Sequence, residues 1–365
     1  MKLKSKLFFF FLLILFSSSF VWGVGVGIYK WFPYFYLIEA KQLLMPKKSK
    51  DFKKIETLKI TDVNEHIKSI NVDTTLLKRK ELINKVINQE STNDISKEKV
   101  SNNSEKIITE IYENKINAIL TYSSKSKKCL KIYIQGHGGN PFHYSYHNKL
   151  SEFFLKEGCD FLSMSMLGLG LNEGNFSYPS KYGKITLNQN MAREHKNYAF
   201  FYDKKNPNLD PLTLFISPHY KIIKSLINDY EDVSIMGISG GGWYTVWLSA
   251  LIPKIKSSIS YAGSLPIEYR KFKGVGGDWE QQDSQIYNYI SYWELYKLMT
   301  IDEEGKINRK AFLVYNDEDD CCFYNPYAEH FKIILDELNW KNLNVIIDKN
   351  KTHTMNVKLI KKIYQ

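Results

Sequence analysis

The fold is decided by residues 233–244, VSIMGISGGGWY, in which an apolar strand pattern runs through G-x-S-x-G into a helix pattern. A serine in this pattern lies on a sharp turn at the carboxyl end of a strand. Gly237 and Gly241 stand where any Cβ would collide with the strand or the helix. We therefore predict a nucleophile at Ser239, where the helix N-terminus favours the anion that forms on attack. The alternative is a chance match in a glycine-containing loop.

Working outward from this turn, apolar strand patterns alternate with helix patterns from about residue 105 onward. Alternation of this kind predicts an α/β fold whose mostly parallel sheet carries helices on both faces. The eight predicted strands are Lys106–Tyr112, Ala118–Tyr122, Leu130–Gln135, Phe161–Met166, Val233–Met236, Ser257–Tyr261, Ala311–Tyr315 and Asn344–Ile347. The predicted helices are Pro211–Tyr230, Gly241–Leu251, Pro326–Asn339 and Met355–Tyr364.

A glycine-rich loop, Gly136-His137-Gly138-Gly139, follows the strand at 130–135. Glycine lets the backbone approach a reacting group closely, so the N–H of Gly138 or Gly139, with that of Gly240, is a candidate oxyanion hole. His137 precedes the serine in the chain, which favours a role in orienting the loop or contacting substrate over a role as base. The alternative is an ordinary glycine-rich turn.

An acidic loop follows the strand at 311–315. Its position in the chain, two strands after the serine, predicts the acid that orients a catalytic histidine. Asp319 is the candidate, Asp317 and Asp320 are its competitors, and an ordinary solvated turn or a weak cation site is the alternative.

His353 lies in the loop after the last predicted strand. Only one other histidine, His330, lies beyond the strand at 311–315, and it falls inside a predicted helix. We therefore predict that His353 is the base. The alternative is an exposed loop histidine.

At these points the sequence resembles the α/β-hydrolase family over residues 105–365. The resemblance implies the α/β-hydrolase fold, acyl transfer from an ester or a related bond through a Ser239–His353–Asp319 triad, and no metal or organic cofactor. Asn316 departs from the family, which usually has glycine at this turn, and this departure leaves the choice of acid open.

Two long insertions, about 167–210 and 263–310, are expected to lie over the active site as lids. The second contains the candidate substrate contacts Asp278, Trp279 and Glu280, followed by several aromatic residues. These would suit recognition of a sugar or peptide. The alternative is an aromatic helix that packs onto the core.

The N-terminus carries Lys2, Lys4 and Lys6 ahead of an uncharged run from Leu7 to Tyr29. As a helix this run would be about 34 Å long, enough to cross a bilayer. The sequence thus predicts a single-pass membrane anchor over 1–29, a juxtamembrane and polar spacer over 30–104, and a catalytic domain on the extracytoplasmic side. The alternative is a cleaved signal peptide and a secreted protein.

The formal net charge of +11 comes from lysines scattered along the chain, without the motifs typical of nucleic-acid binding. We therefore expect no nucleic-acid partner. The spacing of the four cysteines matches no metal site. Cys129 and Cys159 begin two strands expected to be neighbours, so a disulfide between them and two buried thiols are both open.

The function expected from these residues is hydrolysis of an ester in a small-molecule, glycan or lipid substrate, including carbohydrate O-acyl groups, or of a peptide acyl bond. Two alternatives share the same residues: an acyltransferase with a non-water acceptor, and a non-catalytic membrane-tethered binding protein.

Overall fold

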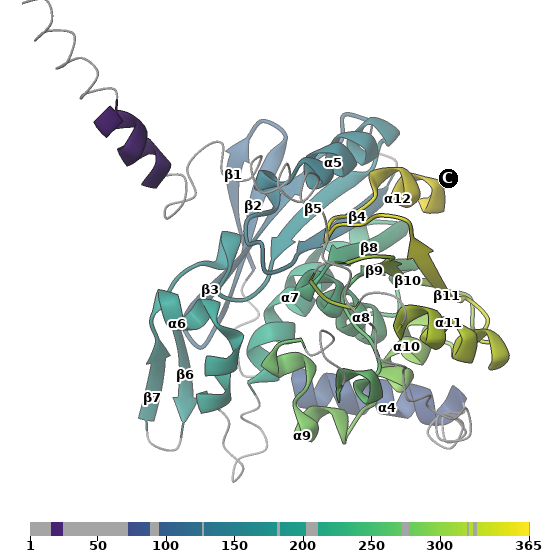
Figure 1. The fold of residues 1–365 in the computed structure, drawn as a ribbon. Coiled ribbons are helices and arrows are strands. Elements are labelled where there is room, and N and C mark those ends of the chain that lie inside the picture. Colours follow the sequence, from purple (N-terminus) through teal and green to yellow (C-terminus); the bar gives the residue numbers. More distant parts are fainter. Residues whose placement is uncertain are drawn as a thin grey trace, which may run out of the picture. The chain divides into compact units, whose positions relative to one another are not determined.

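The computed structural model describes residues 16–24, 72–87, 95–125, 128–180, 183–201, 211–271, 277–319, 321–323 and 327–364. The chain divides into two compact units, Met1–Asp51 and Phe52–Gln365. The first contains the described helix 16–24. All elements below belong to the second unit, whose arrangement is drawn in Figure 1.

A nine-stranded sheet forms the centre of the second unit, in the order β1-β2-β3-β5-β4-β8-β9-β10-β11. The first three pairings are antiparallel, and every pairing from β5 to β11 is parallel. The strands are β1 Ser96–Ser101, β2 Ser104–Ile111, β3 Asn114–Thr121, β4 Cys129–Gln135, β5 Asp160–Ser165, β8 Asp232–Ile238, β9 Ser257–Tyr261, β10 Lys310–Asn316 and β11 Leu343–Asp348.

All eight predicted strands are present, and the prediction of an eight-stranded sheet is one strand short. The additional strand, β1, has six exposed residues, SKEKVS, and forms an edge of the sheet. It pairs with β2 through its backbone, for example Ser96 opposite Ile108. Such a strand buries no apolar side chain, so it leaves no hydrophobic signal in the sequence.

Helices cover both faces of the sheet, as Figure 1 shows. On β4, Ile132 and Ile134 belong to one hydrophobic cluster and Tyr133 to the other, because alternate strand residues face opposite sides. The first cluster contains residues of α4 Val72–Val86, α7 Leu212–Leu226, α8 Gly240–Leu251, α10 Tyr292–Thr300 and α11 Tyr327–Glu337. The second contains residues of α5 Ser145–Glu157 and α12 Val357–Tyr364.

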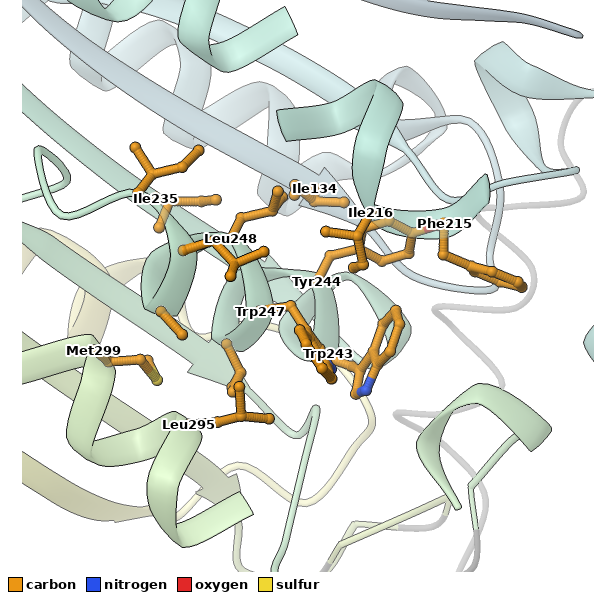
Figure 2. Close-up of a cluster of buried hydrophobic side chains, with 14 of the residues drawn as sticks. Ile134, Phe215, Ile216, Ile235, Trp243, Tyr244, Trp247, Leu248, Leu295 and Met299 are labelled. Atoms are coloured by element: carbon orange, nitrogen blue, oxygen red, sulfur yellow. The ribbon is translucent and has the colours of Figure 1, made fainter. Parts of the chain in front are cut away.

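The helix that follows Ser239, α8, is the centre of the first cluster. Every one of its residues is buried, and a helix that is apolar all round belongs in a protein interior. Trp243 and Trp247 lie between α7 and α10, as Figure 2 shows. The packing fixes α8, and with it the turn that carries Ser239.

The two insertions contain secondary structure. The first has a hairpin of β6 Phe176–Ser180 and β7 Gly183–Leu187, then α6 Gln189–Arg193 and the 3-10 helix η3 His195–Phe201. The second has η6 Trp279–Gln281, α9 Ser284–Tyr287 and α10. Residues 202–210 and 272–276 lie outside the described residues. Within the second insertion Tyr292, Trp293 and Tyr296 are buried in the core, so the aromatic helix packs onto the core, as the alternative interpretation held.

The expected spacer over 30–104 includes α4 and β1, which both lie in the unit of the sheet. Arg79 holds α4 in place: its guanidinium donates to the carbonyls of Ala250, Leu298 and Ile301 at 2.6 to 3.0 Å. These carbonyls lie at the ends of α8 and α10, where helices have unpaired acceptors.

The prediction of a membrane-spanning N-terminal helix, and with it an anchored, extracytoplasmic location, is wrong. Among the described residues no helix is long and apolar enough to cross a membrane. Residues 16–24 of this region are helical. The prediction assumed that the whole uncharged run forms one helix, which composition alone does not establish. The rest of the run from Leu7 to Tyr29 lies outside the described residues.

Cys129 and Cys159 form a disulfide between the start of β4 and the residue before β5, with a Cα–Cα distance of 4.7 Å. Of the two possibilities left open by the sequence, the bridge is the one observed. Cys321 and Cys322 form a second disulfide in the loop after β10.

Candidate active site

Ser239 occupies a strained turn between β8 and α8. Its backbone has φ 56° and ψ −129°, a conformation that a residue with a side chain rarely adopts. The turn is held by the Ser239 N–H, which donates to the Tyr261 carbonyl at 2.9 Å, and by the Trp243 N–H, which donates to the Ser239 carbonyl at 3.1 Å. A strained serine between a strand and a helix is the geometry that the sequence motif predicts.

The glycines on either side of the serine are required by close contacts. A Cβ on Gly237 would lie 2.2 Å from the Gly241 carbonyl oxygen, and one on Gly241 would lie 2.1 Å from the Ile134 carbonyl oxygen. No side chain fits at these distances. The turn therefore packs directly against β4, the strand that leads into the glycine-rich loop.

That loop lies next to the serine. A Cβ on Gly136 would lie 2.7 Å from the Ser239 Cβ and 3.2 Å from the Gly240 nitrogen. Gly240 is the first residue of α8, where a backbone N–H has no partner within the helix. The Gly139 N–H donates to the Gly136 carbonyl at 3.1 Å, so an oxyanion bound to this N–H would compete with that carbonyl. A Cβ on Gly138 would collide with the Tyr144 hydroxyl, 1.9 Å away.

Asp319 lies in the loop after β10 and is 3% exposed. Its Oδ1 accepts the Cys321 and Cys322 N–H groups at 2.8 and 3.2 Å, and its Oδ2 accepts the Asn316 side-chain amide at 2.9 Å. Burial opposes ionisation, but His353 and these donors together lower the pKa of the Asp319 carboxyl below its usual value. Asp319 is therefore held as a carboxylate.

His353 meets this carboxylate. Its Nδ1 lies 2.8 Å from Oδ2 and 3.0 Å from Oδ1 of Asp319, and its side chain is 16% exposed. The structure thus brings two of the predicted site residues together. Asp317 donates its backbone N–H to the Asp348 carbonyl, and Asp320 lies outside the described residues. His330 is on α11, and its Nδ1 hydrogen-bonds to the Tyr269 hydroxyl.

Tyr261, at the end of β9, connects the serine turn with the loops that carry Asp319 and His353. Its carbonyl holds the Ser239 N–H, and its hydroxyl lies 3.0 Å from Asn316 Oδ1 and also contacts Asp348 Oδ2. The same hydroxyl accepts the Asn356 N–H at 3.3 Å. One buried tyrosine therefore bonds to the ends of β8, β10 and β11 and to the segment just after His353.

The candidate substrate contacts form a polar cluster beside the glycine-rich loop. His137 Nε2 lies 2.7 Å from Asp278 Oδ2, and both side chains are about a third exposed. Glu280 is fully buried, with Oε1 3.0 Å from Nδ1 of His195. The rings of His137 and His195 lie 4.9 Å apart. Trp279 is half-buried between these two carboxylates in the chain.

Sequence reasoning did not identify Tyr261 or His195 as residues of this region. It noted Asn316 but did not predict its role. Tyr261 ends a predicted strand, but its sequence position gives no sign of its hydroxyl contacts. His195 lies in a long insertion, which is the one signal that could have drawn attention to it. Asn316, which replaces the usual glycine, supplies the amide that binds Asp319 and so supports the choice of that acid.

Two groups of side chains among the described residues have the composition of a metal site: Cys321, Cys322 and His353, and the polar cluster of His137, His195, Asp278 and Glu280. In the first, both sulfurs are joined in a disulfide and offer no thiolate. In the second group, each of the four side chains offers an atom that can bind a metal ion.

No protein-family model matches the sequence, and no curated protein sequence matches it. Among solved structures, methylesterase BT1017 matches with a TM-score of 0.52 at 14% identity, over 87% of this chain and 71% of that one. Acetyl xylan esterase 1 from Thermoanaerobacterium sp. JW/SL YS485 matches with a TM-score of 0.47 at 14% identity, over 80% and 92%. Est1E from Butyrivibrio proteoclasticus matches with a TM-score of 0.42 at 15% identity, over 71% and 95%.

At these identities the similarity concerns the fold and not the substrate. The same sheet carries the strained serine after β8 and the paired aspartate and histidine after β10 and β11, which is the chain order Ser, acid, His. The chain therefore has the fold of the α/β-hydrolase superfamily.

Proposed function

We propose that the protein is a serine hydrolase that cleaves an ester bond, with Ser239 as nucleophile, His353 as general base and Asp319 as the orienting carboxylate. The observation that carries the proposal is the Asp319–His353 hydrogen bond at the sheet edge where β8 ends in the Ser239 turn. β8, β9, β10 and β11 are parallel, so their carboxyl ends lie along one edge.

In the first half of the reaction, Ser239 Oγ bonds to the acyl carbon as its proton passes to His353 Nε2. Asp319 holds Nδ1–H, which fixes the tautomer in which Nε2 accepts a proton, and stabilises the imidazolium that forms. The alcohol then leaves with the proton from His353. In the second half, water loses a proton to His353, attacks the acyl carbon and releases the acid, and Ser239 regains its proton.

The negative oxygen that forms in each half requires N–H donors in fixed positions. Gly240, at the start of α8, and Gly138 or Gly139 in the adjacent loop are the proposed donors. Removing one such donor typically costs several kcal/mol of transition-state stabilisation, about 10²–10³-fold in rate. The position of Gly136 next to Ser239 and Gly240 supports this choice, because the glycine-rich loop begins beside the turn.

The test is labelling of the full-length protein with a fluorescent fluorophosphonate, together with hydrolysis of p-nitrophenyl acetate. Wild type should be labelled at one site and release p-nitrophenolate. Ser239→Ala and His353→Ala should lose both signals. Ser96→Ala, on the exposed edge strand β1, is the matched serine control and should keep both.

Folded wild-type protein that neither reacts with the fluorophosphonate nor cleaves the ester would refute the proposal and favour a binding protein. Labelling that survives Ser239→Ala would place the nucleophile elsewhere. If labelling is normal but the acyl group leaves only when a sugar or alcohol acceptor is added, the protein is an acyltransferase with the same residues.

A further inference from the structure

Four side chains with metal-binding groups meet beside the serine turn, although they come from three separate segments. His137 lies in the loop after β4, His195 begins η3, and Asp278 and Glu280 flank Trp279 at the start of η6. One ligand atom from each lies within 4.8 Å of the other three. The proposed hydrolysis uses none of these four groups as nucleophile, base or acid.

The hydrogen bonds of His195 determine what its second nitrogen can do. Nε2 lies 3.0 Å from the Leu167 carbonyl oxygen, which can only accept, so Nε2 carries a hydrogen. A lone pair on Nδ1 would face the lone pairs of Glu280 Oε1, 3.0 Å away, so this contact requires either a proton on Nδ1 or a metal ion between the two atoms. Metal-ligating histidines typically donate the N–H of the non-ligating nitrogen to a backbone carbonyl or a carboxylate, as His195 does to the Leu167 carbonyl.

The Glu280 carboxylate gives a second, independent indication. Its side chain is fully buried, and its Oε2 has no hydrogen-bond partner among the described residues. A buried carboxylate oxygen without a partner is costly. A proton on His195 Nδ1 would satisfy Oε1 alone and leave Oε2 without a partner, whereas a metal ion bound by both carboxylate oxygens would contact Oε2 as well.

We propose that His137, His195, Asp278 and Glu280 form a binding site for a divalent transition-metal ion, Zn²⁺ in the first instance. Two imidazole nitrogens and two carboxylates are ligands that Zn²⁺ accepts, and softer thiolate ligands are not part of the set. Bonds of about 2.0–2.2 Å in a tetrahedral site separate ligand atoms by about 3.3–3.6 Å. The His137–Asp278 and His195–Glu280 contacts, at 2.7 and 3.0 Å, would open by less than about 1 Å to receive the ion.

The ion would join the second insertion to the loop beside the nucleophile. A Cβ on Gly240 would lie 2.9 Å from Cε1 of His137, so the His137 ring lies against the first residue of α8. Because His137 and Asp278 are about a third exposed, a water or substrate oxygen could reach the ion from this side as a fifth ligand. Metal binding itself does not depend on the proposed hydrolysis.

The experiment measures metal binding directly. Full-length protein, prepared without a polyhistidine tag and stripped with EDTA, is titrated with Zn²⁺ by calorimetry and with Co²⁺ by visible absorption. We expect one ion per chain and Co²⁺ bands typical of nitrogen and oxygen ligands. His195→Gln and Glu280→Gln should each weaken Zn²⁺ binding by at least about tenfold, since even changes outside the ligand shell have effects of this size.

The matched control is His143→Gln, which removes an exposed histidine near His137 in the chain and should leave Zn²⁺ affinity unchanged. Because His195 and Glu280 are buried, Asp278→Asn at the exposed side is a second variant that spares the core. Its near-ultraviolet circular dichroism should match wild type while Zn²⁺ affinity falls. Wild type that binds neither ion at micromolar concentration, or cluster variants that bind like wild type, would overturn the proposal. Fluorophosphonate labelling of the same samples reports on Ser239 separately.

Discussion

Oδ2 of Asp319 lies 2.8 Å from Nδ1 of His353, and the same oxygen accepts the side-chain amide of Asn316 at 2.9 Å. Oδ1 accepts the Cys321 N–H at 2.8 Å. The carboxylate is therefore fixed from several directions and is 3% exposed. A carboxylate fixed in this way can hold His353 in one tautomer, which is the property that the proposed mechanism requires of it.

Asp319→Asn tests this relationship. The amide keeps the shape of the side chain but no longer holds Nδ1–H, so His353 is expected to adopt the other tautomer. We predict that kcat for p-nitrophenyl acetate falls by about 10⁴-fold. Asp317→Asn, two residues earlier in the same loop, should retain activity within a few-fold. Equal losses in both variants would show that the loop, and not the Asp319 carboxylate, determines activity.

The stability of the protein should depend on pH through the same carboxyl. The folded-state pKa of Asp319 is lowered, so the unfolded chain binds its proton more readily. The stabilisation is present above the ordinary carboxyl pKa and is lost as the pH falls through the folded-state value. Urea unfolding of wild type and Asp319→Asn should therefore show a stability difference at pH 7 that shrinks in acid. A difference that stays constant or grows in acid would contradict this sign.

Much of the sheet could be predicted from the sequence, because central strands such as β4 and β8 are buried on both faces and have apolar sequences, and β3 alternates buried with more exposed residues. β1 could not be predicted, since its contribution is backbone pairing alone and its side chains are exposed. α5 was also missed. Its residues Ser145–Glu157 mix aromatic and charged groups, and only the packing of Tyr146, Leu150 and Phe154 shows which side faces the sheet.

The sequence likewise indicates one part of the candidate site and not the other. Ser239, Asp319 and His353 could be selected as candidates because each follows a strand in a fixed chain order. The His195–Glu280 pair could not, since its partners are 85 residues apart and meet only when the two insertions fold. The prediction of a membrane span at the N-terminus rested on the composition of an apolar run, which does not by itself establish a spanning helix.

The Cys129–Cys159 bridge should make a measurable contribution to stability. It closes a loop with a sequence separation of 30, for which restriction of the unfolded chain corresponds to about 3–4 kcal/mol. The double variant Cys129→Ser, Cys159→Ser should lower the free energy of unfolding by about this amount. In Cys321→Ser, Cys322→Ser the bridge joins neighbours, so a much smaller chain-entropy effect is expected. Similar losses in the two double variants would contradict the loop-closure explanation.

Tyr261→Phe tests whether the hydroxyl that bonds to the loops after β10 and β11 also positions the active site. The substitution keeps the ring and the backbone carbonyl that holds the Ser239 N–H, and it removes only the contacts to Asn316, Asp348 and Asn356. Leaving these buried partners unsatisfied should lower the free energy of unfolding by about 1–3 kcal/mol. Because Asn316 binds Asp319 and Asn356 follows His353, we also expect a lower kcat.

Tyr133→Phe is the matched control. Tyr133 is equally buried, lies in the same hydrophobic cluster as Tyr261, and its hydroxyl donates to Gln135. Removing that hydroxyl should cost a similar amount of stability without touching the loops of Asp319 and His353. Paired measurements of urea unfolding and of kcat with p-nitrophenyl acetate separate the two effects. If both variants lose kcat in proportion to their stability, Tyr261 is a structural residue; a loss confined to Tyr261→Phe establishes it as a positioning residue.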